Sequence, residues 1–192
     1  MWPKAIRFNV RRIYYLDQLI SMPQSYGTYL GGYEGAHADL INHEVIISQG
    51  MREARPFDIV ECLEHEAAGH LTEPRANFLL TRFERLDLML QLIWRIKSPD
   101  RFRSIYVENI SSSTGDVKEE TFNKAVEYWA EIFSGYLHGG YINFSKTDQD
   151  LIEGLLKKTA DDEFDFKKYN DTRHILLESW NKRYLQEHPP QK

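Results

Sequence analysis

Residues 61–73 read ECLEHEAAGHLTE, and the structure expected of the chain can be worked outward from this stretch. Within it, His65, Glu66 and His70 form the one dense cluster of metal-ligating side chains in the sequence. A hydrolytic zinc site needs two neutral imidazoles from one rigid element, a third protein ligand and a position left open for water. It also needs a carboxylate that can take a proton from that water. The pattern His-Glu, with a second His one turn later, supplies three of the four side chains that such a site needs.

The spacing of the two histidines has a structural consequence. They stand five residues apart, which places them about 140° apart around an ideal α-helix. Their imidazoles would diverge on a regular helix, so the sequence predicts a π-bulge or a local unwinding between them. Gly69 precedes the second histidine, and its missing side chain eases such a distortion.

The segments on either side of this stretch predict the elements that hold it in place. Residues 43–48 (HEVIIS) are short and β-branched, which is typical of a strand. The active-site helix is expected over 56–72, beginning at Pro56, a favoured first-turn residue. A second helix is expected over 117–138, with Asp116 as its N-cap.

The remainder of the chain predicts more helix than strand. Apolar spacing indicates helices over 10–22, 75–97, 147–158 and 172–187, a strand over 102–110, and a loop over the Gly- and Tyr-rich residues 25–36. The predicted fold class is therefore α+β and predominantly helical, with a small sheet. We expect one domain over residues 1–192.

Composition excludes several classes of protein. The chain has 192 residues and a net charge of −5, which argues against a protein that binds nucleic acid through phosphate contacts. Its single cysteine, Cys62, cannot form an internal disulfide. The sequence shows no signal peptide and no apolar run of about 18 residues, so we expect a cytoplasmic protein with no membrane partner.

Two short motifs resemble known zinc peptidases. His65–His70, HEAAGH, resembles the HExxGH signature of the dipeptidyl peptidase III family. Glu127–Glu131, EYWAE, resembles the ligand helix of anthrax lethal factor-like peptidases and of the small Pro-Pro endopeptidases. The resemblance covers roughly residues 61–73 and 124–138. In length, the chain is closer to the lethal factor-like peptidases and the small Pro-Pro endopeptidases than to dipeptidyl peptidase III.

The resemblance implies a zincin-like domain of the gluzincin type that hydrolyses peptide or protein substrates. It implies a Zn²⁺ ion bound by His65, His70 and Glu127, with Glu66 as the general base. Glu131 would hydrogen-bond a ligand histidine, and its position one turn after Glu127 places it on the same face of the helix. Because such enzymes commonly bind substrate along an edge strand before the active-site helix, residues 43–48 are expected to be that edge.

The chain departs from the lethal factor-like pattern at one position. Those enzymes place a tyrosine seven residues before the ligand glutamate, where it stabilises the oxyanion, whereas this chain has Glu120 there. His174, in the last predicted helix, is the candidate for that catalytic role. Tyr141 and Tyr169 are its competitors.

Three alternatives remain open from sequence alone. Glu127 and Glu131 would also fit an ordinary solvated stripe, and the chain would then be a non-catalytic helical interaction domain with a structural or relic metal site. The segments His37–Asp39 and His43–Glu44 would fit a second metal site. Cys62 lies three residues before His65, so the two could touch on a helix as in a cysteine–histidine hydrolase, but no nearby Asn or Asp clearly orients the imidazole.

Overall fold

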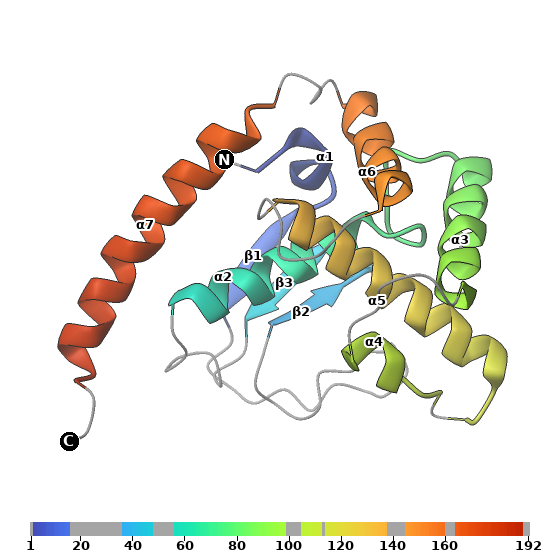
Figure 1. The fold of residues 1–192 in the computed structure, drawn as a ribbon, viewed down its shortest axis with the longest axis horizontal. Coiled ribbons are helices and arrows are strands. Elements are labelled where there is room, and N and C mark those ends of the chain that lie inside the picture. Colours follow the sequence, from blue (N-terminus) through green and yellow to red (C-terminus); the bar gives the residue numbers. More distant parts are fainter. Residues whose placement is uncertain are drawn as a thin grey trace.

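In the computed structural model, the fold is mostly helical with a three-stranded mixed sheet, which confirms the predicted predominantly helical α+β class (Figure 1). The structure describes residues 2–15, 36–47, 56–98, 105–112, 114–137, 145–159 and 164–189. The strands are β1 (Arg12–Tyr15), β2 (Ala36–Asp39) and β3 (Glu44–Ile47). The helices are α1 (Lys4–Arg7), α2 (Pro56–Glu64), α3 (Arg82–Lys97), α4 (Ile105–Asn109), α5 (Val117–Leu137), α6 (Lys146–Lys158) and α7 (Phe166–Glu187).

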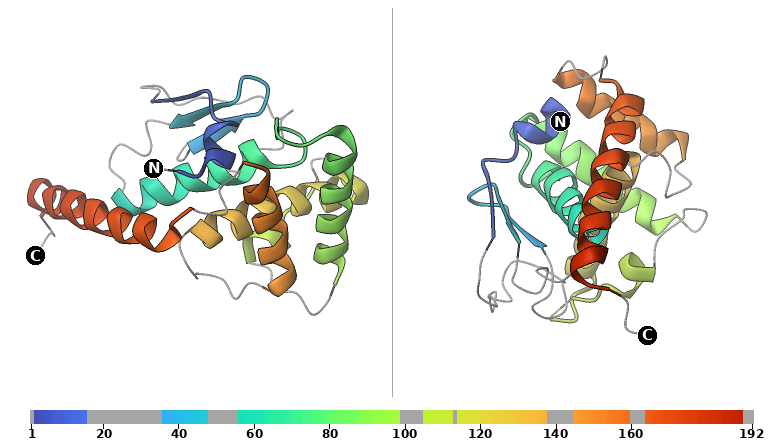
Figure 2. Two further views of the ribbon diagram at one scale, coloured as in Figure 1. Left: turned by 90° about the horizontal axis from the view of Figure 1, so that it is seen from above. Right: turned by 90° about the vertical axis from the view of Figure 1, so that its left-hand side faces the viewer.

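The helix that carries the HEAAGH motif lies in the middle of the fold. It continues from α2 into a π-helical segment, η3 (His65–Gly69), and a 3₁₀ turn, η4 (His70–Thr72), so the predicted helical span 56–72 is confirmed. The sheet lies against one side of this composite helix and α5 packs against the other (Figure 2). Leu71, Trp129 and Phe133 are fully buried in the core between these elements.

The order of strands corrects one prediction. β3 lies in the middle of the described sheet, parallel to β1 and antiparallel to β2. The segment 43–48 is therefore a strand as predicted, but the prediction that it forms an edge is wrong. β2 is the edge strand of the described sheet on the side of the composite helix, which it contacts at η3.

Two elements differ from the sequence expectation. Residues 12–15 form strand β1, although apolar spacing over 10–22 favoured a helix; the local RIYY composition and the parallel ladder to β3 override that periodicity. The predicted strand 102–110 is also wrong in its described part, because α4 occupies Ile105–Asn109. Val107 and Ile110, three residues apart, are both buried, which is a helical rather than an alternating pattern.

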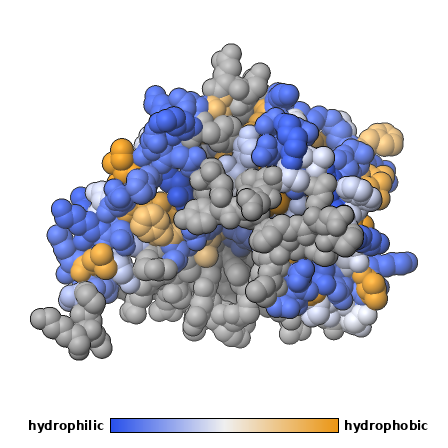
Figure 3. All heavy atoms as spheres, in the orientation of Figure 1, coloured by the Kyte–Doolittle hydropathy of each residue, from blue (hydrophilic) through white to orange (hydrophobic). Residues whose placement is uncertain are grey.

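α3 begins seven residues later than the predicted helix 75–97. Thr81 accepts a hydrogen bond from the Glu84 backbone N–H while the Glu84 carboxylate accepts one from that of Thr81, which forms a capping box. The Thr-x-x-Glu signal for this start is present in the sequence. The outer face of α3 is apolar, and Figure 3 shows hydrophobic side chains at the edge of the molecule where α3 lies. Its exposed apolar residues are Phe83, Leu86, Leu90 and Trp94.

The C-terminal helices match their predictions closely. α5 and α6 occupy the expected spans, and the Asp116 carboxylate accepts a hydrogen bond from the Lys118 N–H at the start of α5. α7 begins six residues before the predicted 172, where the Asp165 side chain caps it. Its second half projects beyond the rest of the molecule (Figures 1 and 2).

Some expectations fall on parts of the chain that are not described. These are residues 16–22 of the predicted first helix, the loop at 25–35 and Tyr141. Among the helices that the structure describes, none combines the length and the apolar character needed to cross a bilayer.

Candidate metal centre

The π-helical segment brings the two histidines together. η3 spans His65–Gly69, so the distortion predicted from the five-residue spacing is confirmed at the predicted place. The i→i+5 repeat of a π-helix puts residues five apart on the same face. The imidazole rings of His65 and His70 meet edge to face, with their centroids 5.1 Å apart.

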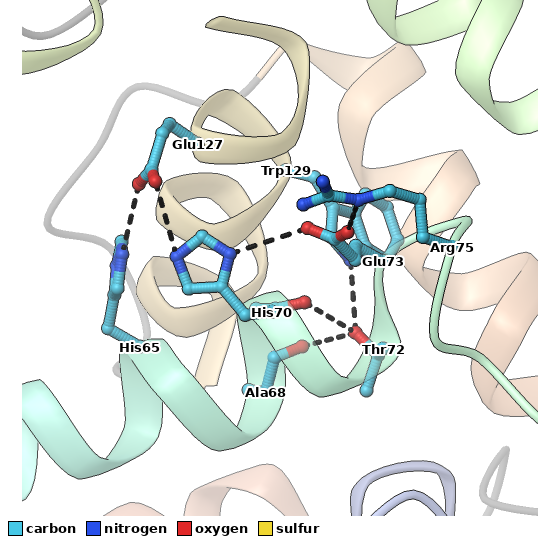
Figure 4. A network of polar contacts seen from close by, with 9 residues as sticks. His65, Ala68, His70, Thr72, Glu73, Arg75, Glu127 and Trp129 are labelled. Atoms are coloured by element: carbon cyan, nitrogen blue, oxygen red, sulfur yellow. Dashed lines mark hydrogen bonds and ion pairs between the residues drawn. The ribbon is translucent and has the colours of Figure 1, made fainter. Parts of the chain in front are cut away.

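Glu127 on α5 completes a cluster of three. His65 Nε2 lies 3.4 Å from Glu127 Oε2, and His70 Nε2 lies 3.4 Å from Glu127 Oε1 (Figure 4). One ligand atom from each residue falls within 4.8 Å of the others. Zinc bonds of about 2.0–2.1 Å in tetrahedral geometry separate two ligand atoms by about 3.3 Å. Each histidine–glutamate separation is therefore close to that of two ligands on one zinc ion, with each histidine facing a different oxygen of Glu127.

The charges in the cluster are strongly coupled. Burial alone lowers the pKa of His70, but the carboxylates of Glu127 and Glu66 outweigh it and hold that pKa well above 6.5. Burial alone raises the pKa of Glu127, but His70 and His65 outweigh it and hold the pKa far below its usual value. Without a metal, these shifts favour a protonated His70 beside an ionised Glu127. A divalent cation would take the place of the proton on His70.

Glu66 lies next to this cluster in the sequence and is buried beside it. Its carboxylate is buried, and burial raises its pKa against the lowering effect of His70 and His65. The backbone N–H of Ala38, on β2, hydrogen-bonds the carboxylate. Its Oε2, like Oε2 of Glu127, is buried without a hydrogen-bond partner. Unsatisfied buried carboxylate oxygens are costly, so their presence here supports a site built for a cation and a water molecule.

Glu73 contacts a candidate ligand, and the sequence analysis missed it. Its side chain is 0% exposed, and Oε2 lies 3.4 Å from His70 Nδ1 (Figure 4). The guanidinium of Arg75 hydrogen-bonds the other oxygen of Glu73. A carboxylate on Nδ1 holds the imidazole so that Nε2 faces the metal. The signal was the i, i+3 spacing of His70 and Glu73, which places both side chains on one face of a helical turn.

Contacts with α5 hold the end of the motif. Trp129 Nε1 donates a hydrogen bond of 3.0 Å to Thr72 Oγ1, and that hydroxyl donates to the carbonyl of Ala68. A Cβ added at Gly69 would lie less than 3.0 Å from Cα and Cβ of Ala130. Because φ of Gly69 is −79°, a value open to every residue, the predicted reason for glycine needs correction. Its absent side chain admits α5 at close range.

The other predicted site residues lie outside this cluster. His174 is on α7, where its side chain is 65% exposed and pairs with Glu178 at 3.1 Å. Tyr169 donates its hydroxyl to Glu64 at 2.6 Å, so this hydroxyl is already engaged away from the triad. Glu131 is half-buried on α5, and its assignment as the partner of a ligand histidine stays a prediction. Glu120, where a tyrosine was expected by resemblance, pairs with Lys124.

The described part of the second candidate metal site has a structural role. His43 is buried, its Nδ1 lies 3.0 Å from the Asn9 carbonyl oxygen, and its ring stacks on Phe78 at 3.6 Å. Asp39 accepts hydrogen bonds from the backbone N–H groups of Ile41 and Asn42 and so closes the turn between β2 and β3. In the described part of the chain, the metal-ligand geometry is met only by His65, His70 and Glu127.

The coupled pair predicts a pH dependence for the metal-free protein. The raised pKa of His70 adds stability that is present below pH 6.5 and is lost as the pH rises through its folded-state pKa. The lowered pKa of Glu127 adds stability that is present above pH 4.5 and is lost as the pH falls. We expect the thermal midpoint in EDTA to fall as the pH is raised from 6 to 9, and to fall less in Glu127→Gln. Equal declines in both proteins would contradict the pairing.

No protein-family model, curated protein or solved structure matches the chain.

Proposed function

We propose that the chain is a zinc-dependent peptidase of zincin-like architecture. The observation that carries the proposal is the convergence of His65, His70 and Glu127 at separations suited to Zn²⁺. Glu66 stands beside them with a buried, unpartnered oxygen. The donor set of two imidazoles and one carboxylate is the set that catalytic zinc sites commonly use.

The proposed mechanism assigns a task to each side chain. His65, His70 and Glu127 would hold the ion, and Glu73 would keep His70 oriented. A bound zinc ion would lower the pKa of a water molecule to about 7 and polarise the scissile carbonyl. Glu66 would take the proton from the attacking water and pass it to the leaving amine.

The position of β2 favours a peptide as the substrate. β2 is an edge of the described sheet, and its Ala38 N–H reaches Glu66. An extended peptide added along this edge would therefore pass close to the general base. The substrate strand is proposed at β2, in place of residues 43–48.

The alternative function is a non-catalytic interaction domain with a structural zinc ion. A structural zinc site is closed by a fourth protein ligand, whereas a catalytic site keeps a position for water. The described residues supply three ligands. The exposed apolar face of α3 is the observation that favours an interaction role.

Metal content tests the proposal. Wild type is expected to bind one equivalent of zinc after reconstitution, and His65→Ala and Glu127→Ala to lose most of it, as measured by elemental analysis. His188→Ala is a matched control, because this histidine is exposed at the C-terminal end of α7. Its ring stacks on Tyr184 and not on a residue of the cluster. Wild type that binds no zinc, cobalt or manganese would end the peptidase proposal.

A further inference from the structure

The π segment is held from both ends. At its C-terminal end, Trp129 reaches Thr72 from α5. At its N-terminal end stands Glu64, the last residue of α2 and the neighbour of His65. The side chain of Glu64 is 1% exposed and takes no part in the proposed mechanism. A carboxylate buried at the junction of an α- and a π-helix calls for a physical explanation.

Two side chains of α7, far from Glu64 in the sequence, hydrogen-bond this carboxylate. Arg173 on α7 donates from Nη2 to Glu64 Oε2 at 2.9 Å and from Nε to Oε1 at 3.0 Å. Tyr169, one turn earlier on α7, donates its hydroxyl to Oε1 at 2.6 Å. The side chain of Trp2 hydrogen-bonds Tyr169 in turn. Such a bidentate fork fixes both the position and the plane of a carboxylate.

We propose that Arg173 and Tyr169 are positioning residues that act through Glu64 to hold the His65 imidazole in ligand geometry. The inference rests on the proposed metal site. A π segment is an uncommon backbone form that persists when its surroundings over-determine it. Glu64 directly precedes His65, the first residue of the π segment. Holding the Glu64 side chain in place therefore also restrains the backbone from which the His65 imidazole extends. A histidine displaced by even about 0.5 Å would no longer share a zinc ion well with His70 and Glu127.

Simple docking of α7 explains the arrangement less well. A buried ion pair is weak evidence for stability, because well-packed apolar side chains of similar volume often stabilise a protein as much or more. Leu177, one turn after Arg173, is buried on the same helix and supplies docking of that kind. Packing by Leu177 can dock α7, whereas the charged contacts also set the orientation of the Glu64 carboxylate.

The experiment compares zinc affinity among variants of the full chain. The hydrogen bonds from Arg173 and Tyr169 to the Glu64 carboxylate are called the carboxylate clasp below. It is disturbed in Arg173→Leu, Glu64→Gln and Tyr169→Phe. Leu177→Ala removes α7 packing while leaving the clasp in place. The dissociation constant for zinc is measured by competition with a chromophoric chelator. The visible absorption of the cobalt-substituted protein reports ligand geometry, and the thermal midpoint of the metal-free protein reports folding.

Arg173→Leu is expected to weaken zinc binding about tenfold and to change the cobalt spectrum. Leu177→Ala is expected to lower the thermal midpoint, yet to leave zinc affinity within about twofold and the cobalt spectrum unchanged. If Leu177→Ala weakens zinc binding as much as Arg173→Leu, the clasp is only structural and the inference fails. If Arg173→Leu does not fold, Tyr169→Phe decides, and unchanged affinity in that variant overturns the inference. Wild type that binds no metal removes the proposed function itself, a separate and earlier failure.

Discussion

Glu66→Gln is expected to lower peptide hydrolysis by about 10²- to 10⁴-fold while zinc content stays at one equivalent. Glutamine has nearly the same shape and keeps an oxygen for the Ala38 N–H, but it cannot accept and return a proton. Turnover of a peptide library by the zinc-loaded protein measures the first effect, and elemental analysis measures the second.

Glu61→Gln is the matched control for this substitution. Glu61 lies on the same helix, one turn before Glu66 and exposed to solvent, so the same chemical change should leave both quantities unaltered. Turnover retained in Glu66→Gln would remove Glu66 as the base. Zinc lost from that variant would show that Glu66 serves the metal rather than the reaction.

Gly69→Ala is expected to destabilise the fold by about 3 kcal/mol and to weaken zinc binding at least about tenfold. The added methyl group would overlap Ala130 at its Cα and Cβ, and backbone atoms on two packed helices cannot move aside separately. α5 must shift away from η3, and Glu127 moves with it. Chemical denaturation and a zinc competition titration measure the two effects.

Gly154→Ala distinguishes this steric effect from the general cost or benefit of alanine. Gly154 lies exposed on α6, where an added Cβ would meet nothing within 4 Å. Alanine there should stabilise the protein by about 0.5–1 kcal/mol, because glycine is a poor helix former. If Gly69→Ala behaved like Gly154→Ala, the close approach of α5 to the π segment would be disproved.

Features that depend on neighbouring residues were predicted correctly from the sequence. The five-residue spacing of His65 and His70 requires a distorted helix in any fold that uses both as ligands, and η3 is that distortion. The spans of α5 and α6 followed from apolar periodicity and cap residues that lie within the elements themselves. These signals need no knowledge of the rest of the chain.

Local sequence patterns did not predict elements whose conformation depends on a partner strand. Residues 12–15 are extended because they pair with β3, and an apolar pattern compatible with a helix did not reveal that partner. The position of β3 between two other strands is a property of the sheet as a whole. The capping box at Thr81 was readable from the sequence and was overlooked.

For the proposed site, the sequence by itself indicated the candidate residues: His65, Glu66 and His70 through their spacing, and Glu127 through the motif on its helix. Only the tertiary structure decided that Glu127 meets both imidazoles and that Arg173 and Tyr169 on α7 hydrogen-bond Glu64. The physical reason is the range of the forces involved. Helical spacing is set by bonds within a few residues, whereas these contacts depend on how helices far apart in the sequence pack together.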